Sequence, residues 1–549
     1  MDLSKLKISG VKDPWKAGSE LGWTIIDGAH VEESQTIEAD VAIIGTGAGG
    51  GVSAEILTAA GLKVVMIEAA RLKSSDEFNM AEGEAYRDLY QEAAARGSKD
   101  GAITILQGRA VGGTTVVNWT SSFRTPEQTL AFWGERFGVA EMSRAEMNPW
   151  FEKMEQRLKI SKWAMPPNAN NEVLKKGCEK LGWSWSVIPR NVDGCWNLGY
   201  CGMGCPTNAK QSMLVTTLPE AMKGGATLIH SAEAWTLQQE DGKVSAIQCR
   251  ALDKDKRPTG VTLTVKAKTV IAAGGGINTP ALLMRSKVPD PHQLIGKRTF
   301  LHTTTFAFGD YEQTIDGYYG APQSTYSDEF VWRDGADGDL GYKLEIMPMH
   351  PGLISSLTGG FGKKAFEELS RLPHLSSAIA LLRDGFNEQS VGGSVELNEA
   401  GEPILDYPIN EYLLEGAKHS HYSMVEMHFA AGAKRVRAGH SLATFCDSWE
   451  EARAQIDELP YEAGFVGLGS AHVMGGCPLG EDESQCVVDS DGKFKHLDNL
   501  YVFDGSVFPT SLGVNPQLTI YGMTAKNATA LALRLTEQKG LAERQAAEV

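Results

Sequence analysis

The sequence predicts an α/β fold in which a Rossmann-like dinucleotide-binding domain is interrupted by an inserted segment. Two observations support this prediction. A short apolar run, 40–44, ends at the glycine-rich loop 45–50, and a helical stretch and a second apolar run follow up to Ile67. This order is typical of a βαβ unit. Residues 303–460 have a different, aromatic-rich pattern, and the features of the cofactor domain resume near residue 465.

Length and composition limit the possible functions. The chain has 549 residues, which exceeds the usual size of one hydrophobic core and favours two domains. A net charge of −17 argues against a nucleic-acid partner, because phosphate binding uses clustered Lys and Arg. We find no apolar h-region at the N-terminus and no apolar run of about 20 residues. We therefore expect a cytoplasmic protein.

Three of the eight cysteines lie close together in the sequence, at Cys195, Cys201 and Cys205. This spacing matches neither the paired cysteines of zinc sites nor the cysteine runs of ferredoxins. A metal site remains an alternative. We favour buried thiols or a local disulfide and expect no bound metal.

The remaining segments are predicted from their hydrophobic periodicity. Residues 1–38 read as an irregular arm that Pro14, Trp15 and Trp23 hold against the body. Strand patterns fill 227–265 around a turn at Asp241-Gly242, and further strands are expected at 268–273 and 303–319. Helices after the first are expected at 79–96, 280–284, 376–382, 411–431 and 523–535.

The loop after the first strand has the spacing of a pyrophosphate-binding site. Its residues are Gly45, Thr46, Gly47, Ala48, Gly49 and Gly50. The first glycine permits a tight turn, the second lets the backbone approach the phosphates, and the third lets helix and strand pack closely. The free N–H groups of the following helix face the phosphate charge. Glu68 ends the second strand, where its carboxylate can accept hydrogen bonds from ribose hydroxyls.

The C-terminal region favours FAD over NAD, which the glycine loop alone does not separate. Asp504 and Gly505 end a strand there, and Asn515-Pro516-Gln517 precedes a helical run. Pro516 fits the first position of this helix, with Asn515 as its cap. Such a helix directs its positive end at an anionic group, and the pyrimidine edge of a reduced flavin is one.

At this point the chain resembles the glucose–methanol–choline (GMC) family of FAD-dependent oxidoreductases. The resemblance covers most of residues 38–535. It rests on the glycine loop with Glu68, the block 112–118, the stretch 274–283, the stretch 472–477, and the C-terminal motifs just described. Asn118-Trp119-Thr120 and the stretch 201–205 are most similar to long-chain alcohol oxidases and their bacterial dehydrogenase relatives.

The resemblance implies an FAD/NAD(P)-binding Rossmann-like domain with an inserted antiparallel-sheet substrate domain. We expect an N-terminal arm at 1–38, a discontinuous FAD-binding domain at 39–302 and 465–549, and a substrate-binding domain at 303–464. The expected FAD contacts beyond the glycine loop are Glu68, Arg109, Gly112, Gly113, Thr114, Thr115, Asn118, Ala273, Gly274, Asp504, Gly505, Pro516 and Gln517. Some members attach the flavin covalently through a His where this chain has Val117, so we expect non-covalent FAD.

By the same resemblance, His472 faces the flavin N5 and Asn515 occupies the second catalytic position. A neutral imidazole can accept the hydroxyl proton of an alcohol while hydride leaves its carbon for N5. The Asn515 amide can hold the developing alkoxide without competing as a base. His302 matches another family position, for which we expect a structural role.

We therefore predict oxidation of an alcohol, with a lipophilic primary alcohol favoured. The apolar residues from Ile346 to Ile354 are most simply core, and the alternative is a mobile lid that admits such a substrate from a membrane surface. The electron acceptor is expected to be oxygen, a quinone or a small carrier, and a dehydrogenase is favoured over an oxidase. The alternatives are a sugar or sterol dehydrogenase and a non-redox FAD-dependent lyase or isomerase.

Overall fold

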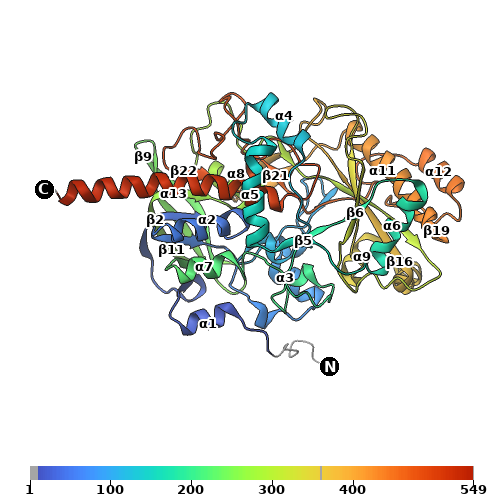
Figure 1. Cartoon of the computed structure of the whole chain (residues 1–549), viewed down its shortest axis with the longest axis horizontal. Coiled ribbons are helices and arrows are strands. Elements are labelled where there is room, and N and C mark those ends of the chain that lie inside the picture. Colours follow the sequence, from blue (N-terminus) through green and yellow to red (C-terminus); the bar gives the residue numbers. More distant parts are fainter. Residues whose placement is uncertain (1–9, 359–360, 548–549) are drawn as a thin grey trace.

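Two eight-stranded sheets, placed side by side, organise the molecule (Figure 1). The computed structural model describes residues 10–358 and 361–547. Residues 1–9 of the expected arm, 359–360 and 548–549 lie outside the described residues. Within the described ranges, no helix combines the length and the apolar character needed to cross a membrane.

The first sheet carries the predicted βαβ unit. Its order is β1-β8-β3-β2-β11-β10-β9, and β22 also pairs with β11. Strands β1, β8, β3, β2, β11 and β22 run parallel to one another. Strands β9, β10 and β11 form an antiparallel meander. Its strands are β1 (Thr24–Asp27), β2 (Gln35–Ile44), β3 (Val64–Ile67), β8 (Thr227–His230), β9 (Ala232–Glu240), β10 (Lys243–Leu252), β11 (Pro258–Ala272) and β22 (Leu500–Val502). The predicted turn Asp241-Gly242 joins β9 to β10, with both residues at positive φ.

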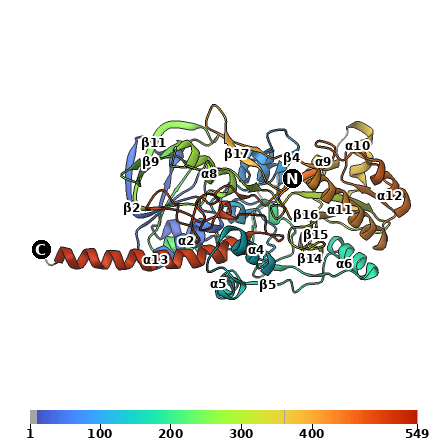
Figure 2. The same cartoon turned by 90° about the horizontal axis from the view of Figure 1, so that it is seen from above.

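Helices pack together beside this sheet. The long helix α13 (Gln517–Ala547) packs on α2 (Ala48–Ala59) and α5 (Arg144–Arg157), and α2 also packs on α7 (Thr217–Lys223). The C-terminal end of α13 extends beyond the rest of the molecule in both views (Figures 1 and 2). The glycine loop and the start of α13 therefore lie in the same half of the molecule although more than 400 residues separate them in sequence.

The second sheet is mainly antiparallel. Its order is β4-β20-β13-β16-β15-β14-β6, with β19 also paired to β13. Its strands are β4 (Ile103–Ile105), β6 (Ser186–Val187), β13 (Thr304–Asp310), β14 (Thr325–Phe330), β15 (Tyr342–Ile346), β16 (Leu375–Leu382), β19 (Arg435–Ala438) and β20 (Leu468–Ser470). The helices α6 (Ala169–Leu181), α11 (Glu411–Ala430) and α12 (Trp449–Glu458) gather beside it (Figure 1).

The two faces of the second sheet have different environments because successive side chains of a strand point to opposite faces. On β15, Tyr342, Leu344 and Ile346 belong to the apolar core that includes α11. The alternate residues Lys343 and Glu345 therefore face away from that core. On β16 and β13 the same alternation turns a second apolar cluster, which includes Phe308, Ile379 and Leu381, away from α11. This second face forms a wall of the cavity described below.

The other helices are short, and the other strands form three separate two-stranded sheets, β12-β21, β17-β18 and β5-β7. The helices are α1 (Pro14–Glu20), α3 (Glu82–Leu89), α4 (Glu127–Phe137), α8 (Gly275–Arg285), α9 (Pro351–Thr358) and α10 (Gly362–Ser370). The strands are β5 (Ile160–Lys162), β7 (Pro189–Asn191), β12 (Thr299–Phe300), β17 (Ser394–Leu397), β18 (Pro403–Asp406) and β21 (Met474–Gly475). The helices predicted at 52–60, 280–284, 411–431 and 523–535 all lie within or closely overlap observed helices.

Three sequence predictions of secondary structure are wrong. Residues 376–382 form strand β16 rather than a helix, because hydrogen bonds to β13 and β15 bury this apolar run on both sides. The helix predicted at 79–96 ends at Leu89, and Glu92 and Ala93 have left-handed backbone dihedrals. The arm is not irregular throughout, since β1 joins the parallel sheet and buried Trp15 anchors α1.

Candidate active site

The glycine loop is shaped by close backbone contacts at Gly49 and Gly50 and by a turn at Gly45. Gly45 has φ +98° and forms the turn at the end of β2. A Cβ on Gly49 would lie 1.5 Å from the Phe503 carbonyl oxygen, and one on Gly50 would lie 1.9 Å from that of Gly45. Among the described residues, the only atom near a Cβ placed on Gly47 is the Cα of Gly113, at 3.7 Å. Gly49 and Gly50 thus serve packing, and Gly47 keeps the start of α2 open to a ligand.

Glu68 fastens this loop from the end of β3. Its Oε2 accepts hydrogen bonds from the backbone N of Thr46 at 3.1 Å and from its hydroxyl at 2.6 Å. Its Oε1 accepts one from the backbone N of Ala70 at 3.0 Å. Burial raises the pKa of the Glu68 carboxyl. The residue predicted to hold a ribose therefore also holds the phosphate loop.

The second predicted block reaches the loop through Thr46. The Thr46 hydroxyl accepts a hydrogen bond from the backbone N of Gly112 at 2.9 Å. Residues Gly113–Val116 form a short 3-10 turn, and Asn118 follows it. The Asn118 amide donates to Gln517 Oε1 at 2.7 Å, which connects this block to the start of α13.

The C-terminal motif closes the same region. The Asp504 carboxylate accepts from the backbone N of Gly275 at 2.8 Å and from the hydroxyl of Thr279 at 2.6 Å. It thereby ties β22 to the start of α8, next to Ala273 and Gly274. The helix α13 begins at Gln517 rather than Pro516, and Asn515 is not its cap. The Asn515 amide instead donates to Glu345 Oε2 at 3.4 Å, and its Oδ1 has no partner in the described part of the chain.

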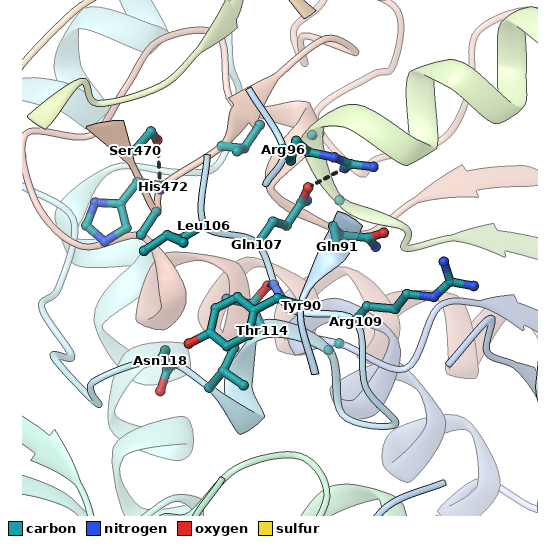
Figure 3. Close-up of a pocket in the computed structure, with 18 of the residues that line it drawn as sticks. Tyr90, Gln91, Arg96, Leu106, Gln107, Arg109, Thr114, Asn118, Ser470 and His472 are labelled. Carbon is teal, nitrogen blue, oxygen red and sulfur yellow. Dashed lines mark hydrogen bonds between the residues drawn. The ribbon is translucent and has the colours of Figure 1, made fainter. Parts of the chain in front are cut away.

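These segments line one cavity of about 890 Å³. Among the predicted site residues, the ones that line it are Gly45, Gly47, Ala48, Gly49, Glu68, Arg109, Gly113, Thr114, Thr115, Asn118, Ala273, Gly274, His472, Asp504, Gly505, Asn515, Pro516 and Gln517. Gly50 and Gly112 do not line it, because Gly50 packs against the backbone of Gly45 and Gly112 packs against Val116 and Leu214. In Figure 3, His472 and Asn118 lie toward one side of the cavity and Arg109 toward the other.

His472 lies between β20 and β21 and is held through its backbone. Its N–H donates to Ser470 Oγ at 3.1 Å (Figure 3). The Ser470 hydroxyl donates in turn to the Leu301 carbonyl oxygen at 2.5 Å. Burial lowers the pKa of His472 to about 4, so its imidazole is neutral at pH 7. The ring nitrogen Nδ1 lies 3.1 Å from Nδ1 of His302.

The far end of the cavity is apolar. Its lining there comes from the second sheet and from α9, and includes Phe306, Met347, Leu353, Leu357, Ile379 and Leu381. One buried acid, Glu345, lines the cavity among them. Sequence reasoning missed Glu345, although a Lys and a Glu at alternate positions of an otherwise apolar strand was a detectable signal. It also underrated His302, whose contact with His472 joins residues 170 apart in sequence.

The three clustered cysteines have free thiols in the described structure. All eight cysteines are free thiols in the described residues, so the alternative of a local disulfide is not realised. The described ranges also hold no group of three or more His, Cys, Asp or Glu side chains arranged to bind a metal ion. Arg190 donates to the sulfur of Cys201 at 3.6 Å.

Known proteins similar to the chain agree with this architecture. Two family models described as GMC oxidoreductase match residues 86–304 and 389–524. An uncharacterized GMC-type oxidoreductase of Mycobacterium tuberculosis is 30% identical over 488 residues, which are 88% of this chain and 74% of the relative. A long-chain-alcohol oxidase of Arabidopsis thaliana is 27% identical over 93% of this chain and 70% of its own length.

Solved structures show the same fold at lower identity. Pyridoxine 4-oxidase from Mesorbium loti has a TM-score of 0.65 and 16% identity, with 89% of this chain and 98% of that chain covered. Formate oxidase from Aspergillus oryzae has a TM-score of 0.66 and 15% identity, and the match covers 93% of this chain and 99% of that chain. These matches confirm the predicted α/β fold with its Rossmann-like domain.

The glycine loop and the cavity suit a dinucleotide cofactor, and the matching family models define an oxidoreductase. The chain belongs to the GMC oxidoreductase family. The predicted cofactor, FAD, is confirmed by this membership. The cavity fits FAD on its own geometry, because the open start of α2 at Gly47 and the unpartnered, buried Nε of Arg109 in the described structure are suited to a phosphate-bearing group.

Proposed function

We propose that the protein oxidises the hydroxyl group of a lipophilic primary alcohol to an aldehyde. One observation carries the proposal. A neutral, half-buried imidazole, that of His472, lies in the same cavity as the FAD loop, and the amide of Asn515 lines that cavity too. A base and a hydrogen-bond donor in the cofactor cavity are the two groups that alcohol oxidation requires of the protein.

In this mechanism the protein binds, orients and deprotonates the alcohol. His472 accepts the hydroxyl proton, and an N–H of Asn515 donates to the oxygen on which negative charge develops. FAD, which the glycine loop and the residues around it would hold, would supply the acceptor for the hydride of the alcohol carbon. The apolar lining excludes water and thereby strengthens both interactions. We also propose that FAD is bound non-covalently, because the position that carries a flavin-linked His in some relatives is Val117.

The proposal of a lipophilic substrate rests on the apolar end of the cavity. Helix α9 contributes Leu353 and Leu357 to the lining, so its opposite side faces outward next to the substrate end. Phe361 and Phe366, which immediately follow, are 91% and 73% exposed. Two exposed aromatic rings beside Lys363 and Lys364 suit contact with a lipid surface. We propose that the α9–α10 segment contacts membranes or substrate aggregates from which the alcohol enters.

The electron acceptor completes the cycle and is proposed to be oxygen, a quinone or a small carrier. The long-chain-alcohol oxidase among the relatives favours oxygen by its name. Our sequence prediction of a dehydrogenase remains untested. Admission of oxygen to the reduced enzyme separates the two, since an oxidase is reoxidised fast and a dehydrogenase slowly.

An anaerobic substrate panel tests the proposed function. The purified FAD-loaded protein is mixed with aliphatic primary alcohols of increasing chain length, a sugar and a sterol, and the flavin absorbance is followed. We expect rapid bleaching by the longer aliphatic alcohols. Bleaching by the sugar or the sterol alone would assign a different substrate class, and no bleaching by any alcohol would refute the proposal.

A further inference from the structure

Glu345 is a fully buried carboxyl group in the wall of the active-site cavity. It lies on β15, on the face that alternation turns away from the α11 core. Its exposed fraction is 0%, and it lines the same cavity as His472 and Asn515. A buried acid is costly unless its oxygens are hydrogen-bonded or charge-paired. The cost of burying the Glu345 carboxyl in the cavity wall suggests that this side chain has a role in the site.

The polar contact of Glu345 in this structure is with Asn515. The amide Nδ2 of Asn515 donates to Glu345 Oε2 at 3.4 Å. The second carboxyl oxygen, Oε1, is buried and has no partner among the described residues. Oδ1 of Asn515 is also buried and has no hydrogen-bond partner in the described structure. The two side chains thus form a pair whose outer atoms remain available to a bound molecule.

The charged groups around Glu345 come from two strands. Lys343, two residues earlier on β15, is buried and bonded to Asp328 of β14. Its ammonium lies 3.7 Å from the centre of the Tyr326 ring, and Tyr326 is the residue opposite Glu345 on β14. On the other side, β16 places the uncharged Ile379 opposite Glu345.

These surroundings set the protonation of Glu345. Burial raises the pKa of its carboxyl to about 7, and Lys343 and the Asn515 hydrogen bond oppose that rise. The negative charge of Asp328 raises the pKa of Glu345 further, by a smaller amount. Glu345 therefore changes its charge within the pH range in which enzymes are ordinarily assayed.

The charge of Glu345 decides which end of the Asn515 amide faces it. An ionised carboxylate can only accept hydrogen bonds, so it requires the NH₂ end. The second N–H of that NH₂ group is then free to donate to another oxygen. A protonated carboxyl can also donate, and it then tolerates the amide oxygen in place of the NH₂ group. An amide turned in this way would present its NH₂ group elsewhere.

We propose that ionised Glu345 is a positioning residue that holds the Asn515 amide with one N–H directed at the alcohol oxygen. This inference rests on the proposed function, because it assigns Asn515 to that oxygen. Glu345 acts through Asn515 and does not itself exchange a proton with the substrate.

A double-mutant cycle tests whether Glu345 acts through Asn515. The rate of anaerobic flavin reduction is measured for wild type, Glu345→Ala, Asn515→Ala and the double variant. We expect Glu345→Ala to slow reduction by about 10- to 100-fold in the wild-type background, the cost of an unmade buried hydrogen bond. In the Asn515→Ala background the same change should alter the rate less than about twofold. Equal effects in both backgrounds would overturn the inference.

The isosteric variant Glu345→Gln tests the role of the charge and does not depend on the folding of the alanine variant. In the wild type, flavin reduction should rise with pH through a midpoint near 7, because the ionised form is the effective one. In Glu345→Gln this midpoint should disappear, since an amide oxygen accepts at every pH. Glu55→Gln, a substitution outside the cavity, is the matched control and should keep the midpoint.

A spectroscopic measurement adds a readout independent of turnover. A buried-carboxyl infrared band that titrates near pH 7 is expected in the FAD-loaded wild type, and this titrating component should be missing in Glu345→Gln while any band of Glu68 remains. A midpoint that survives in Glu345→Gln, or no such band in the wild type, contradicts the inference. If Asn515→Ala does not slow flavin reduction, the role proposed for Asn515 is wrong and the inference falls with it. If Asn515→Ala slows reduction but shows no coupling to Glu345, only the inference is wrong.

Discussion

The imidazole rings of His302 and His472 are joined through their Nδ1 atoms, 3.1 Å apart. A hydrogen bond between two Nδ1 atoms requires a proton on one of them only. If His472 carries it, the lone pair of His472 is on Nε2, as a base acting at that atom needs. His302 is then the acceptor, and its own proton is on the buried Nε2. Burial and the nearby His472 lower the pKa of His302 well below its usual value, which keeps it neutral.

Replacing His302 should therefore impair the base without removing it. We expect His302→Ala to retain FAD but to slow flavin reduction by about 10-fold, the typical cost of one lost hydrogen bond. His302→Asn should recover part of the rate, because its amide oxygen can accept from His472 and Asn tolerates the observed φ of +48°. Stopped-flow reduction by a primary alcohol measures both, with His374→Ala, outside the cavity, as control. An alanine variant as fast as wild type would exclude this role.

Glu68 should govern FAD affinity through the loop that it fastens. Glu68→Ala removes the acceptor of two hydrogen bonds from Thr46 and leaves the loop donors unpaired. We expect FAD to dissociate about 10- to 100-fold more readily, on the basis of the usual cost of such losses. Release of fluorescent FAD on dilution measures this effect. Glu77→Ala, which removes only a surface ion pair with Arg71, should leave affinity unchanged; equal losses in both variants would contradict the assignment.

Acid should destabilise the protein through buried histidines. Burial lowers the pKa of His421 to about 3 and that of His428 to about 4, both on α11. Unfolding frees each ring to bind a proton below about pH 6.5. The free energy of unfolding should thus fall as pH drops from 6.5 toward 4, by about 1.4 kcal/mol per pH unit for each histidine.

Thermal unfolding between pH 7.5 and 4.5 measures this slope. His421 bonds to the hydroxyls of Thr305 and Tyr461, which a glutamine can also reach. His421→Gln should make the midpoint temperature less sensitive to pH than in the wild type. A variant with unchanged pH sensitivity would show that His421 does not carry the effect.

The exposed rings of Phe361 and Phe366 should mediate contact with lipid. We expect the wild type to float with vesicles of phosphatidylcholine and phosphatidylglycerol in a density gradient, and Phe361→Ser/Phe366→Ser not to float. Leu533→Ser removes a comparably exposed apolar side chain on α13 and should still float. Failure of the wild type to float would refute the membrane contact.

The sequence was most informative where function depends on local backbone geometry. The loop from Gly45 to Gly50 can be predicted because its roles follow from neighbouring residues: a tight turn, a close approach and a helix start. The helix 411–431 was likewise predicted because its 3.6-residue pattern is long. Its observed bounds are Glu411–Ala430.

Sequence reasoning failed where the structure depends on contacts between residues that are far apart in the sequence. Six of the eight residues of Leu375–Leu382 are apolar and all eight are buried, so no periodicity separates a buried strand from a helix. The relationship of Glu345 to Asn515 depends on a sheet register and a loop 170 residues away. Thr24–Asp27 becomes a strand only because β8 offers it an edge.

The reduction of bound flavin by a primary alcohol in a single anaerobic turnover, compared between wild type and His472→Ala, tests the central claim most directly. Both proteins should bind FAD equally, because the glycine loop and Glu68 are untouched. The wild type should bleach rapidly, and the variant about 10²- to 10⁴-fold more slowly, the usual contribution of a general base. Equal rates of bleaching in the two proteins would contradict the assignment of His472 as the base.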